Sequence, residues 1–252
     1  MKTVLATAAN DNFAIPGAVA LLSAACKGVE CLLVDCGLTD SSRRRVEDAF
    51  ARRSMGLTIE KPLQDLGQVQ TSWQTDPSAY GRLSAPLIAE QMGARRTLYI
   101  DADTLTIGTV APLLDRHLAG KPVGAIRASR IRKPGYFNSG VLLIANALWA
   151  AGDVSGAVID RAGELEQSSY PEQDALNDVL AGQWQELPQI WNWEVPRSVS
   201  VRLGRTVVSR HGATNLGENR ILHFLGSTKP WDEGYPPTAY KRMWYRLAGQ
   251  LA

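Results

Sequence analysis

Cysteine is scarce in this chain, and long apolar runs are absent. Cys26, Cys31 and Cys36 are the only cysteines in 252 residues, an odd set that a cytosolic chain keeps reduced. A zinc site would need a fourth ligand and usually paired CxxC spacing, which is absent, so buried thiols around a strand are expected. The N-terminal apolar stretch turns polar at Asn10 and is too short for a signal peptide or membrane span. We therefore expect a cytoplasmic protein.

An excess of either charge is also absent. The chain has 27 Lys and Arg against 25 Asp and Glu, a net charge of +2, and 21% charged residues. This balance argues against a disordered chain and against a general nucleic-acid binder. The hydrophobic content is 45%, which is ample to bury a core in one domain with or without a small lobe.

Strand-like and helix-like segments alternate along the first hundred residues. Strands are expected over 2–6, 30–35, 57–60 and 97–100, and helices over 13–26, 41–53 and 81–92. Further on, strands are expected over 123–126 and 141–144, and helices over 154–166, 172–180 and 238–251. The alternation predicts an α/β fold with a mostly parallel, Rossmann-like sheet flanked by helices. Such sheets bind ligands at the carboxyl ends of their strands.

An Asp-x-Asp tripeptide directly follows the apolar run 97–100. Side chains two apart in a strand point the same way, so Asp101 and Asp103 can aim two carboxylates at one point. Two negative charges this close repel unless a positive charge lies between them, and a divalent cation with oxygen ligands supplies that charge. A solvated turn also explains the tripeptide alone, but its position after an apolar strand favours a metal site.

Histidine, glycine and lysine follow one another near the end of the chain. His223 ends an apolar run, where a histidine usually belongs to the core, but Gly226 and Lys229 come within six residues. Glycine lets the backbone approach an anion closely, and lysine supplies a point charge for phosphate. Asp101, Asp103 and His223, with two diphosphate oxygens, form a suitable ligand set for manganese, with magnesium as the harder alternative.

Two further polar segments adjoin expected strands and helices. Asn138 precedes a buried run; a turn entering a strand explains it, and an amide that binds a sugar hydroxyl is the functional alternative. Glu172 and Asp174 suit the positive end of a helix dipole. That account does not explain Gln173 or Asn177 well.

Together these four segments resemble glycosyltransferase family 8, a retaining family with the GT-A fold that includes galactosyltransferases and glycogenin-like enzymes. The resemblance runs from Thr7 to Trp231 and keeps the motifs in the family's order. It implies a single GT-A domain over 1–252, with a nucleotide-binding half over 1–105 and a sugar and acceptor half over 106–252. It also implies a small irregular C-terminal region on the acceptor side.

The resemblance implies a role for each matching residue. Ala8, Asn10 and Asn12 lie where the family binds the uridine, although the family often has an acid at the position of Asn10 and usually an aspartate at that of Glu172. The other implied contacts to the sugar donor are Arg82, Asp101, Ala102, Asp103, Glu172, Gly226 and Lys229. The implied metal ligands are Asp101, Asp103 and His223, and the implied catalytic residues are Asn138, Gln173 and Asp174.

The implied reaction is manganese-dependent transfer of a hexose, glucose or galactose, from a UDP-sugar to a saccharide or glycolipid such as a lipopolysaccharide core. Its transition state resembles an oxocarbenium ion, as in glycoside hydrolysis. Gln173 matches the side chain on the opposite face of the sugar, but an amide is a weak nucleophile, so front-face attack is favoured.

Two basic segments have no assigned role. The run 127–133, with Arg130 and Arg132, is typical of a solvated loop; a mobile lid or a contact to an anionic acceptor is the alternative. The final helix carries Tyr240 and Trp244 on one face and basic residues off it, which favours packing on the sheet and at most a weak membrane-surface contact.

Two other classes of protein compete with this interpretation. Sugar-1-phosphate nucleotidyltransferases also place metal-binding aspartates on an α/β sheet, but residues 8–15 lack their usual glycine-rich, basic signature. A non-catalytic nucleotide-sugar binding module need not retain every metal ligand, so the set Asp101, Asp103 and His223 argues against it.

Overall fold

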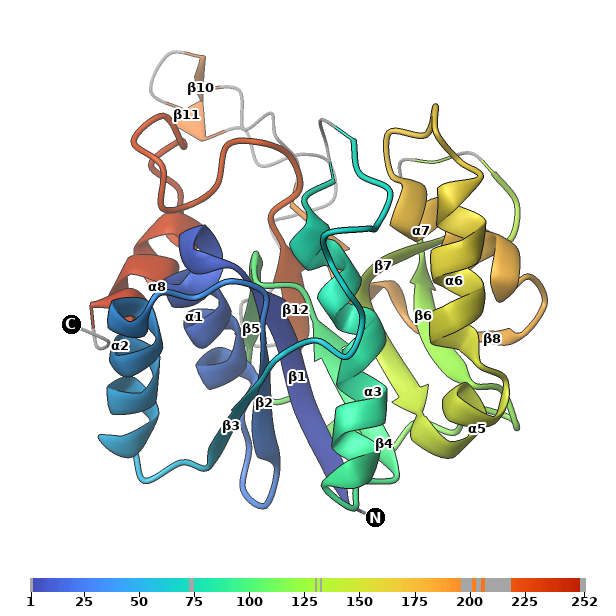
Figure 1. Ribbon diagram of the computed structural model, residues 1–252. Helices are drawn as coiled ribbons and strands as arrows, with labels where there is room; N and C mark the ends of the chain where they lie inside the picture. The colour runs from blue at the N-terminus through green and yellow to red at the C-terminus, as the bar shows by residue number, and fades with distance from the viewer. Residues whose placement is uncertain are drawn as a thin grey trace.

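The computed structural model describes residues 2–72, 75–129, 131, 133–195, 201–202, 205–206 and 219–249. Its central sheet has seven strands: β1 (Thr3–Ala9), β2 (Glu30–Asp35), β3 (Leu57–Glu60), β4 (Arg96–Ile100), β6 (Val123–Arg127), β7 (Phe137–Ala145) and β8 (Trp184–Glu186). Their order across the sheet is β3-β2-β1-β4-β7-β6-β8 (Figure 1). Arg130 and Arg132, in the expected basic loop, lie outside the described residues.

The sheet is mostly parallel, as the alternation of elements predicts. Strands β3, β2, β1 and β4 pair in parallel, and β6 pairs in parallel with β8. Strand β7 is antiparallel to both of its neighbours, β4 and β6. The first residues of β7 therefore lie at the same edge of the sheet as the last residues of β4.

Helices cover both faces of this sheet (Figure 1). One face carries α1 (Ala14–Ala24), α2 (Asp40–Ala51) and α8 (Ala239–Ala248), and the other carries α3 (Gly81–Gln91), α5 (Asn146–Ala151), α6 (Val154–Gly163) and α7 (Pro171–Val179). Alternate strand side chains supply two cores, because neighbours in a strand point to opposite faces. In β1, Leu5 belongs to the core under α1, whereas Val4 and Ala6 belong to the core under α3.

A second, three-stranded sheet was not expected from the sequence. It consists of β5 (Thr104–Ile107), β12 (Arg220–His223) and β9 (Trp193–Glu194), in the order β5-β12-β9. Strand β12 is antiparallel to β5, with His223 opposite Thr104. The pairing joins segments more than a hundred residues apart, so no local pattern predicts it. It brings the histidine of the last third next to the Asp-x-Asp segment.

The remaining elements are short. They are α4 (Ala111–Leu114), β10 (Val201–Arg202), β11 (Arg205–Thr206) and the 3-10 helices η1 (Asp11–Phe13), η2 (Pro77–Tyr80) and η3 (Gln189–Asn192). The helix expected over 238–251 is α8, which ends at Ala248; residues 250–252 lie outside the described part. None of the described helices is long and apolar enough to cross a membrane.

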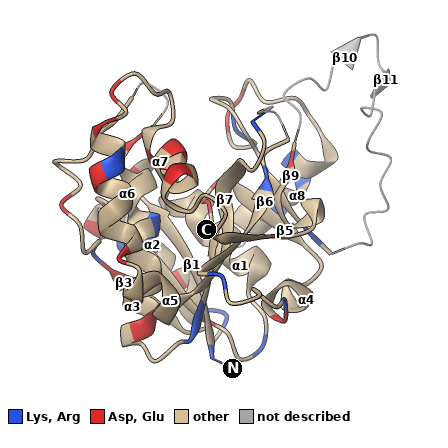
Figure 2. Cartoon of the chain, turned by 90° about the vertical axis from the view of Figure 1, so that its right-hand side faces the viewer, with Lys and Arg blue, Asp and Glu red and all other residues tan. Residues whose placement is uncertain are grey.

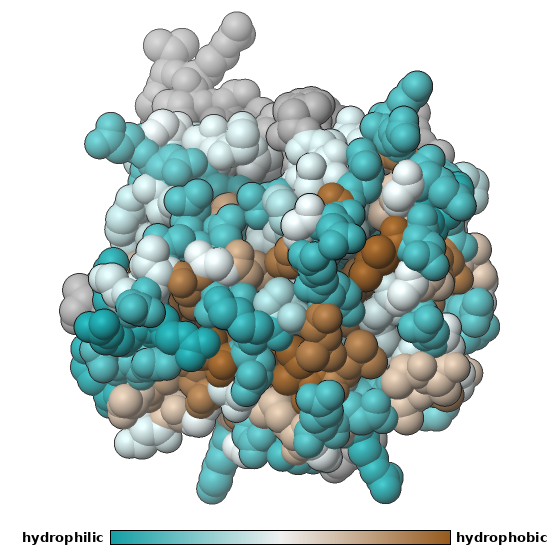
Figure 3. Space-filling model, in the orientation of Figure 1, coloured by the Kyte–Doolittle hydropathy of each residue, from teal (hydrophilic) through white to brown (hydrophobic). Residues whose placement is uncertain are grey.

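The surface in the orientation of Figure 1 is largely hydrophilic, with apolar areas near its centre (Figure 3). The large hydrophobic side chains that stay exposed among the described residues are Leu63, Ile131, Leu148, Tyr170 and Tyr245. They come from separate segments of the chain, and single exposed apolar residues are ordinary on a protein surface.

Candidate metal and sugar-donor site

The Asp-x-Asp segment forms a turn between β4 and β5. The backbone N–H of Thr104 donates to the carbonyl oxygen of Asp101 at 3.1 Å, and the Thr104 hydroxyl donates to the same oxygen at 2.7 Å. The backbone N–H of Phe224 donates to the carbonyl oxygen of Asp103 at 3.0 Å, which attaches the turn to the end of β12. The two carboxylates therefore converge through a turn, not through the alternation of an extended strand.

Three candidate metal ligands meet at this turn. Nε2 of His223 lies 3.1 Å from Oδ1 of Asp103 and 3.7 Å from Oδ2 of Asp101. One ligand atom from each residue lies within 4.8 Å of the others. His223 is only 3% exposed. Two carboxylates and an imidazole around one point are a donor set that fits a divalent cation such as Mn²⁺.

The charges within this cluster depend on one another. Burial alone would raise the pKa of Asp103, but His223 and Lys229 hold it well below its ordinary value. Burial alone would lower the pKa of His223, but Asp103 and Asp101 raise it overall. Each group thus stabilises the charged form of its neighbour, and a cation that binds between them competes with a proton for the imidazole.

Lys229 reaches the cluster from the loop after β12. Its ammonium group donates to Oδ2 of Asp103, and to the carbonyl oxygen of Phe224 at 2.6 Å. Gly226 turns this loop with φ of 96°, a left-handed conformation that favours glycine. Trp231 packs against Phe13 and Trp244, with ring centroids 5.8 and 5.1 Å away. This packing anchors the loop of Lys229 against η1 and α8.

Arg82, on α3, joins four parts of the site. The side chain is 6% exposed, and its guanidinium donates to the carbonyl oxygens of Ala79 and Ser139 at 2.9 and 2.6 Å. It also lies 3.1 Å from Oδ1 of Asp101 and 3.2 Å from Oε1 of Glu172. Burial would lower the pKa of Arg82, but Asp101 and Glu172 raise it, so the arginine stays charged. It therefore offsets two carboxylates at once.

Glu172 is the carboxylate that depends most on Arg82. It is 2% exposed, and its Oε1 makes no hydrogen bond of good geometry. Burial raises the pKa of Glu172 to about 7, although Arg82 acts in the opposite direction. A carboxyl group whose pKa is higher in the folded state than in the unfolded state stabilises the fold in its neutral form. Its contribution to the free energy of unfolding is complete below the unfolded-state pKa, and it is lost as the pH rises through the folded-state pKa.

We expect Glu172→Gln to remove this pH dependence. In metal-free buffer, wild-type stability relative to the variant should fall by about 3 kcal/mol between pH 4.5 and 8, because the pKa rises from 4.5 to about 7. Denaturant unfolding at several pH values measures the difference. Glu90→Gln, on an exposed position of α3, is the matched control. A constant difference between wild type and Glu172→Gln over this range would contradict the buried, raised carboxyl.

Gln173 and Asp174, in the first turn of α7, belong to one hydrogen-bond network. The amide oxygen of Gln173 accepts from the backbone N–H of Ser139 at 3.0 Å and from its hydroxyl at 3.2 Å. The amide nitrogen donates to the hydroxyl of Tyr136 at 3.1 Å, and that hydroxyl donates to Asp174 at 2.5 Å. Red segments of the α7 ribbon in Figure 2 mark its Asp and Glu residues. Tyr136 thus orients both residues, a role that sequence reasoning missed.

Asn177 has a structural role that the sequence did not reveal. Its side chain accepts from the backbone N–H of Phe137 at 2.7 Å and donates to the carbonyl oxygens of Phe137 and Gln173 at 3.0 and 2.8 Å. These bonds attach α7 to the first residue of β7. They hold the helix that carries Glu172 and Gln173 against the sheet.

Asn138 lies within β7, not in a turn before it, and forms a second network. Its Oδ1 accepts from the backbone N–H of Gly140 at 2.9 Å and from Nδ2 of Asn192 at 2.7 Å. Oδ1 of Asn192 lies 2.9 Å from Nδ1 of His223. Sequence reasoning missed Asn192, because it lies in the tryptophan-rich segment and reaches the site only through tertiary contacts.

Gly140 leaves space for the ring of His223. A Cβ atom at this position would lie 2.6 Å from Nδ1 of His223 and 2.9 Å from Oδ1 of Asn138. Real Cβ atoms do not come this close to their neighbours, so the histidine packs directly on the backbone of β7. The glycine of the Asn-Ser-Gly segment is therefore required by the histidine.

We expect Gly140→Ala to move His223 and to weaken Mn²⁺ binding by about 10-fold or more, because the ring has no space to keep its position. Crowding should also lower stability by about 1–3 kcal/mol. Electron paramagnetic resonance of free Mn²⁺ measures the affinity. Gly163→Ala, where a new Cβ meets nothing within 4 Å, is the control. Unchanged Mn²⁺ affinity in Gly140→Ala would show that His223 does not bind the cation in this position.

The residues expected to contact uridine lie at the carboxyl end of β1. Ala8 is buried in β1, and Asn12 is exposed in η1. Oδ1 of Asn10 accepts from the backbone N–H of Phe13 at 3.2 Å, and its Nδ2 donates to Asp76 at 3.2 Å. Asn10 thus caps η1, a structural role that leaves one amide hydrogen for a ligand. The remaining expected residue is Ala102, which is buried in the turn after β4.

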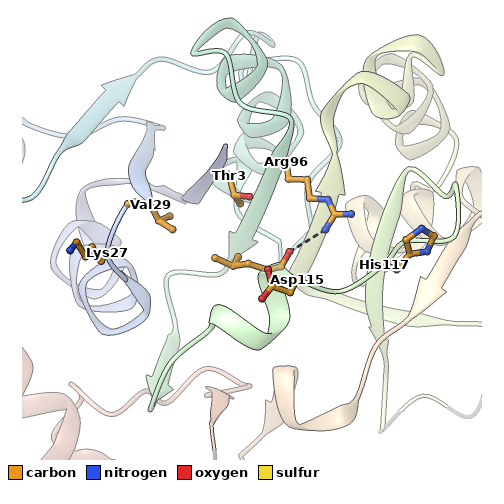
Figure 4. A pocket seen from close by; sticks show the side chains of 8 residues that line it. Thr3, Lys27, Val29, Arg96, Asp115 and His117 are labelled. Carbon is orange, nitrogen blue, oxygen red and sulfur yellow. Dashed lines mark hydrogen bonds between the residues drawn. The ribbon is translucent and has the colours of Figure 1, made fainter. Parts of the chain in front are cut away.

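A cavity of about 360 Å³ lies at the opposite end of the sheet (Figure 4). Thr3 and Arg96, the first residues of β1 and β4, line it with Lys27 and Asp115. The dashed line in Figure 4 joins Arg96 to the carbonyl oxygen of Leu114, at 3.1 Å. No group of the metal cluster reaches this cavity, so it is separate from the site described above.

Solved structures with this fold include glycosyltransferases. The structure of galactosyltransferase LgtC in complex with donor and acceptor sugar analogs matches with a TM-score of 0.80 over 99% of this chain and 96% of that chain, at 20% identity. The apo form of glycosyltransferase GlyE of Streptococcus pneumoniae TIGR4 matches with a TM-score of 0.70 over 98% of this chain and 60% of that chain, at 16% identity. At these identities the likeness concerns the fold, and it identifies the GT-A fold expected from the sequence.

Curated relatives are similar in sequence. General stress protein A of Bacillus subtilis is 27% identical over 221 residues, which cover 81% of this chain and 77% of that protein. Lipopolysaccharide glucosyltransferase WaaO of Escherichia coli is 30% identical over 158 residues, 56% of this chain and 45% of that protein. Lipopolysaccharide 1,3-galactosyltransferase of Salmonella typhimurium is 27% identical over 165 residues, 58% and 47% respectively. The aligned part thus spans less than half of each lipopolysaccharide enzyme.

A sequence model of one protein family assigns this chain to a family. It matches residues 68–234, which include α3, the Asp-x-Asp turn, β7, α7 and the loop of Lys229. More than half of the chain therefore fits one family of transferases, and the chain belongs to glycosyl transferase family 8.

Proposed function

We propose that this chain is a retaining hexosyltransferase that transfers glucose or galactose from a UDP-sugar to a saccharide or glycolipid acceptor, with Mn²⁺ as its cation and Mg²⁺ as the alternative. One observation carries the proposal: Asp101, Asp103 and His223 meet beside Lys229 at the carboxyl end of β4. The similar lipopolysaccharide glucosyl- and galactosyltransferases support hexose as the transferred group and a lipopolysaccharide core as an acceptor class.

The chemistry requires stabilisation of a leaving diphosphate. A divalent cation held by Asp101, Asp103 and His223 would neutralise charge that develops on the diphosphate oxygens. The ammonium of Lys229 lies beside the same carboxylates and binds phosphate as a point charge. Arg82 holds Asp101 in place, because its guanidinium lies 3.1 Å from that carboxylate.

The position of Gln173 favours front-face attack. Its amide oxygen, the only atom of the side chain that could attack a sugar carbon, already accepts two hydrogen bonds from Ser139. Those bonds withdraw electron density from an oxygen that is a weak nucleophile to begin with. The acceptor hydroxyl then attacks on the side of the leaving diphosphate, which takes up its proton, and configuration is retained.

We expect Gln173→Ala to keep measurable turnover and to bind UDP-sugar as wild type does. In front-face attack the amide contributes to positioning and forms no bond to the sugar. Initial rates and donor affinity, measured with the same acceptor, test this. Complete loss of transfer with intact donor binding, or isolation of a glycosylated enzyme, would instead support a covalent intermediate.

Release of UDP from purified protein tests the proposed function. UDP-glucose, UDP-galactose and UDP-N-acetylhexosamines are each incubated with Mn²⁺ or with EDTA, with and without oligosaccharide acceptors. Slow Mn²⁺-dependent release from one hexose donor is the expected result. Thermal stabilisation by UDP with Mn²⁺ is measured in the same samples, because hydrolysis alone can require an acceptor. Neither release nor stabilisation in any sample would contradict the proposal.

A further inference from the structure

We propose that Asn192 is a positioning residue of this site. It holds His223 in the tautomer that leaves Nε2 free for a cation. It also holds Asn138 so that only the NH2 group of that side chain faces a ligand. The inference rests on the proposed function for the identity of that cation and ligand. Asn192 itself is 1% exposed and lies at the end of η3. It therefore acts through its neighbours.

The orientation of each amide follows from one backbone group. The N–H of Gly140 can only donate, and it lies 2.9 Å from the side chain of Asn138. The Asn138 atom that faces it must therefore be the oxygen. The same oxygen lies 2.7 Å from the side chain of Asn192, so the Asn192 atom there must be the nitrogen. No choice of amide orientation remains.

The oxygen of the Asn192 side chain then determines the tautomer of His223. Its oxygen faces Nδ1 of His223 at 2.9 Å, and because an amide oxygen only accepts, Nδ1 must carry a hydrogen. In the charged ring Nε2 carries a second hydrogen, toward Asp103, and when a cation displaces that hydrogen the lone pair is on Nε2. Nε2 faces Asp103 and Asp101, at 3.1 and 3.7 Å. A lone pair directed at two carboxylates is favourable when a cation lies between them. In metal-binding histidines, a hydrogen bond from the nitrogen that does not bind the metal fixes the tautomer and the orientation of the ring.

The same network restricts Asn138. Its oxygen already accepts two hydrogen bonds, from Gly140 and Asn192, so both of its lone pairs are used. The group left for a ligand is the NH2, which donates and cannot accept. Asn192 thereby links the cation ligand His223 to the residue expected beside the donor sugar.

Two variants of Asn192 separate the two roles. Asn192→Leu removes both the oxygen toward His223 and the nitrogen toward Asn138, and we expect Mn²⁺ affinity to fall about 10–100-fold. Asn192→Asp keeps an oxygen toward Nδ1 of His223 but loses the hydrogen-bond donor toward Asn138. It should therefore bind Mn²⁺ much better than the leucine variant while the KM for the UDP-sugar rises. Asn146→Leu is the matched control, because Asn146 is a buried amide that bonds Thr97 near the other end of β4.

Nitrogen-15 NMR of the histidine rings reads the tautomer directly and without a metal. His223→Gln identifies the signal among the chain's three histidines. At a pH where the ring is neutral, we expect Nδ1 of wild-type His223 to keep its hydrogen for Asn192, and the hydrogen to move to Nε2, toward the carboxylates, in Asn192→Leu. A hydrogen on Nε2 in wild type, or wild-type Mn²⁺ affinity in a folded Asn192→Leu, would overturn the inference. Wild type that binds no Mn²⁺ would contradict the proposed cation instead, and the NMR result would still decide the role of Asn192.

Discussion

Asp103→Asn is expected to lower Mn²⁺-dependent release of UDP by about 10²–10³-fold, the cost of removing one preorganised charge-stabilising group. Asp103 is the point where the site's groups meet: one oxygen faces Nε2 of His223 and the other accepts from Lys229. Asparagine keeps the size of the side chain but loses its charge and one acceptor. The cation then loses a ligand, and Lys229 loses the carboxylate that holds it in the site.

The effect of Asp103→Asn is compared with that of a control variant outside the site. Asp115→Asn changes the same atoms at an exposed position beside the cavity at the other end of the sheet, and it should leave UDP release unchanged (Figure 4). Wild type in EDTA should lose activity to a similar extent as Asp103→Asn. If Asp103→Asn retained Mn²⁺-dependent release within a few-fold of wild type, Asp103 would not be a cation ligand.

Arg82→Met is expected to destabilise the fold by about 3–5 kcal/mol, because it leaves the buried Glu172 and the partly buried Asp101 without the guanidinium that compensates their charge. Glu172 is 2% exposed and has no other basic partner among the described ion pairs, and Asp101 loses a guanidinium 3.1 Å away. The substitution also removes the hydrogen bonds that Arg82 donates to the carbonyl oxygens of Ala79 and Ser139. Denaturant unfolding at pH 8 in EDTA measures the loss.

A second substitution tests the cause. Glu172→Gln removes one of the uncompensated charges, so the double variant Arg82→Met/Glu172→Gln should recover part of the stability. Arg161→Met is the matched control: Arg161 pairs with Asp178 and Glu164 at the surface, and its removal should cost no more than about 1 kcal/mol. Equal losses in the single and double variants would show that packing, not charge compensation, makes Arg82 necessary.

The strands and helices near the start of the chain were predicted from local pattern alone. Strands β2 and β3 begin and end where their apolar runs do, and Thr39 caps α2 by accepting from the backbone N–H of Ser42 at 3.2 Å. The pairing of β5 with β12 was not predictable, because each strand has four residues and its partner is distant in sequence. Pairing over such distances depends on the whole fold.

The parts of the site that are motifs were predicted, whereas the parts that support them were not. Asp101, Asp103 and His223 are residues of the types that bind metals, so residue type and position predicted that they would meet. Asn192 and Tyr136 act by orienting other residues, and nothing in their local sequence distinguishes them from core residues. The assignment to family 8 also leaves no place for the nucleotidyltransferase alternative.

Because β7 runs antiparallel to its neighbours, its first residues lie at the site. The part of the site on β7 and the loops around the site therefore differ in mobility. Asn138 lies on β7 opposite Ile126 of β6, and the backbone of Ser139 is held by hydrogen bonds from its N–H to Gln173 and from Arg82 to its carbonyl oxygen, so neither residue lies on a loop. Groups on a central strand move only when a large part of the domain opens, whereas surface loops open locally. In the proposed function this surface faces the donor sugar, and its position on the strand makes it stiff. Loops that border it can change in length or sequence without deforming that surface, so acceptor preference can diverge among related chains while the donor side stays the same.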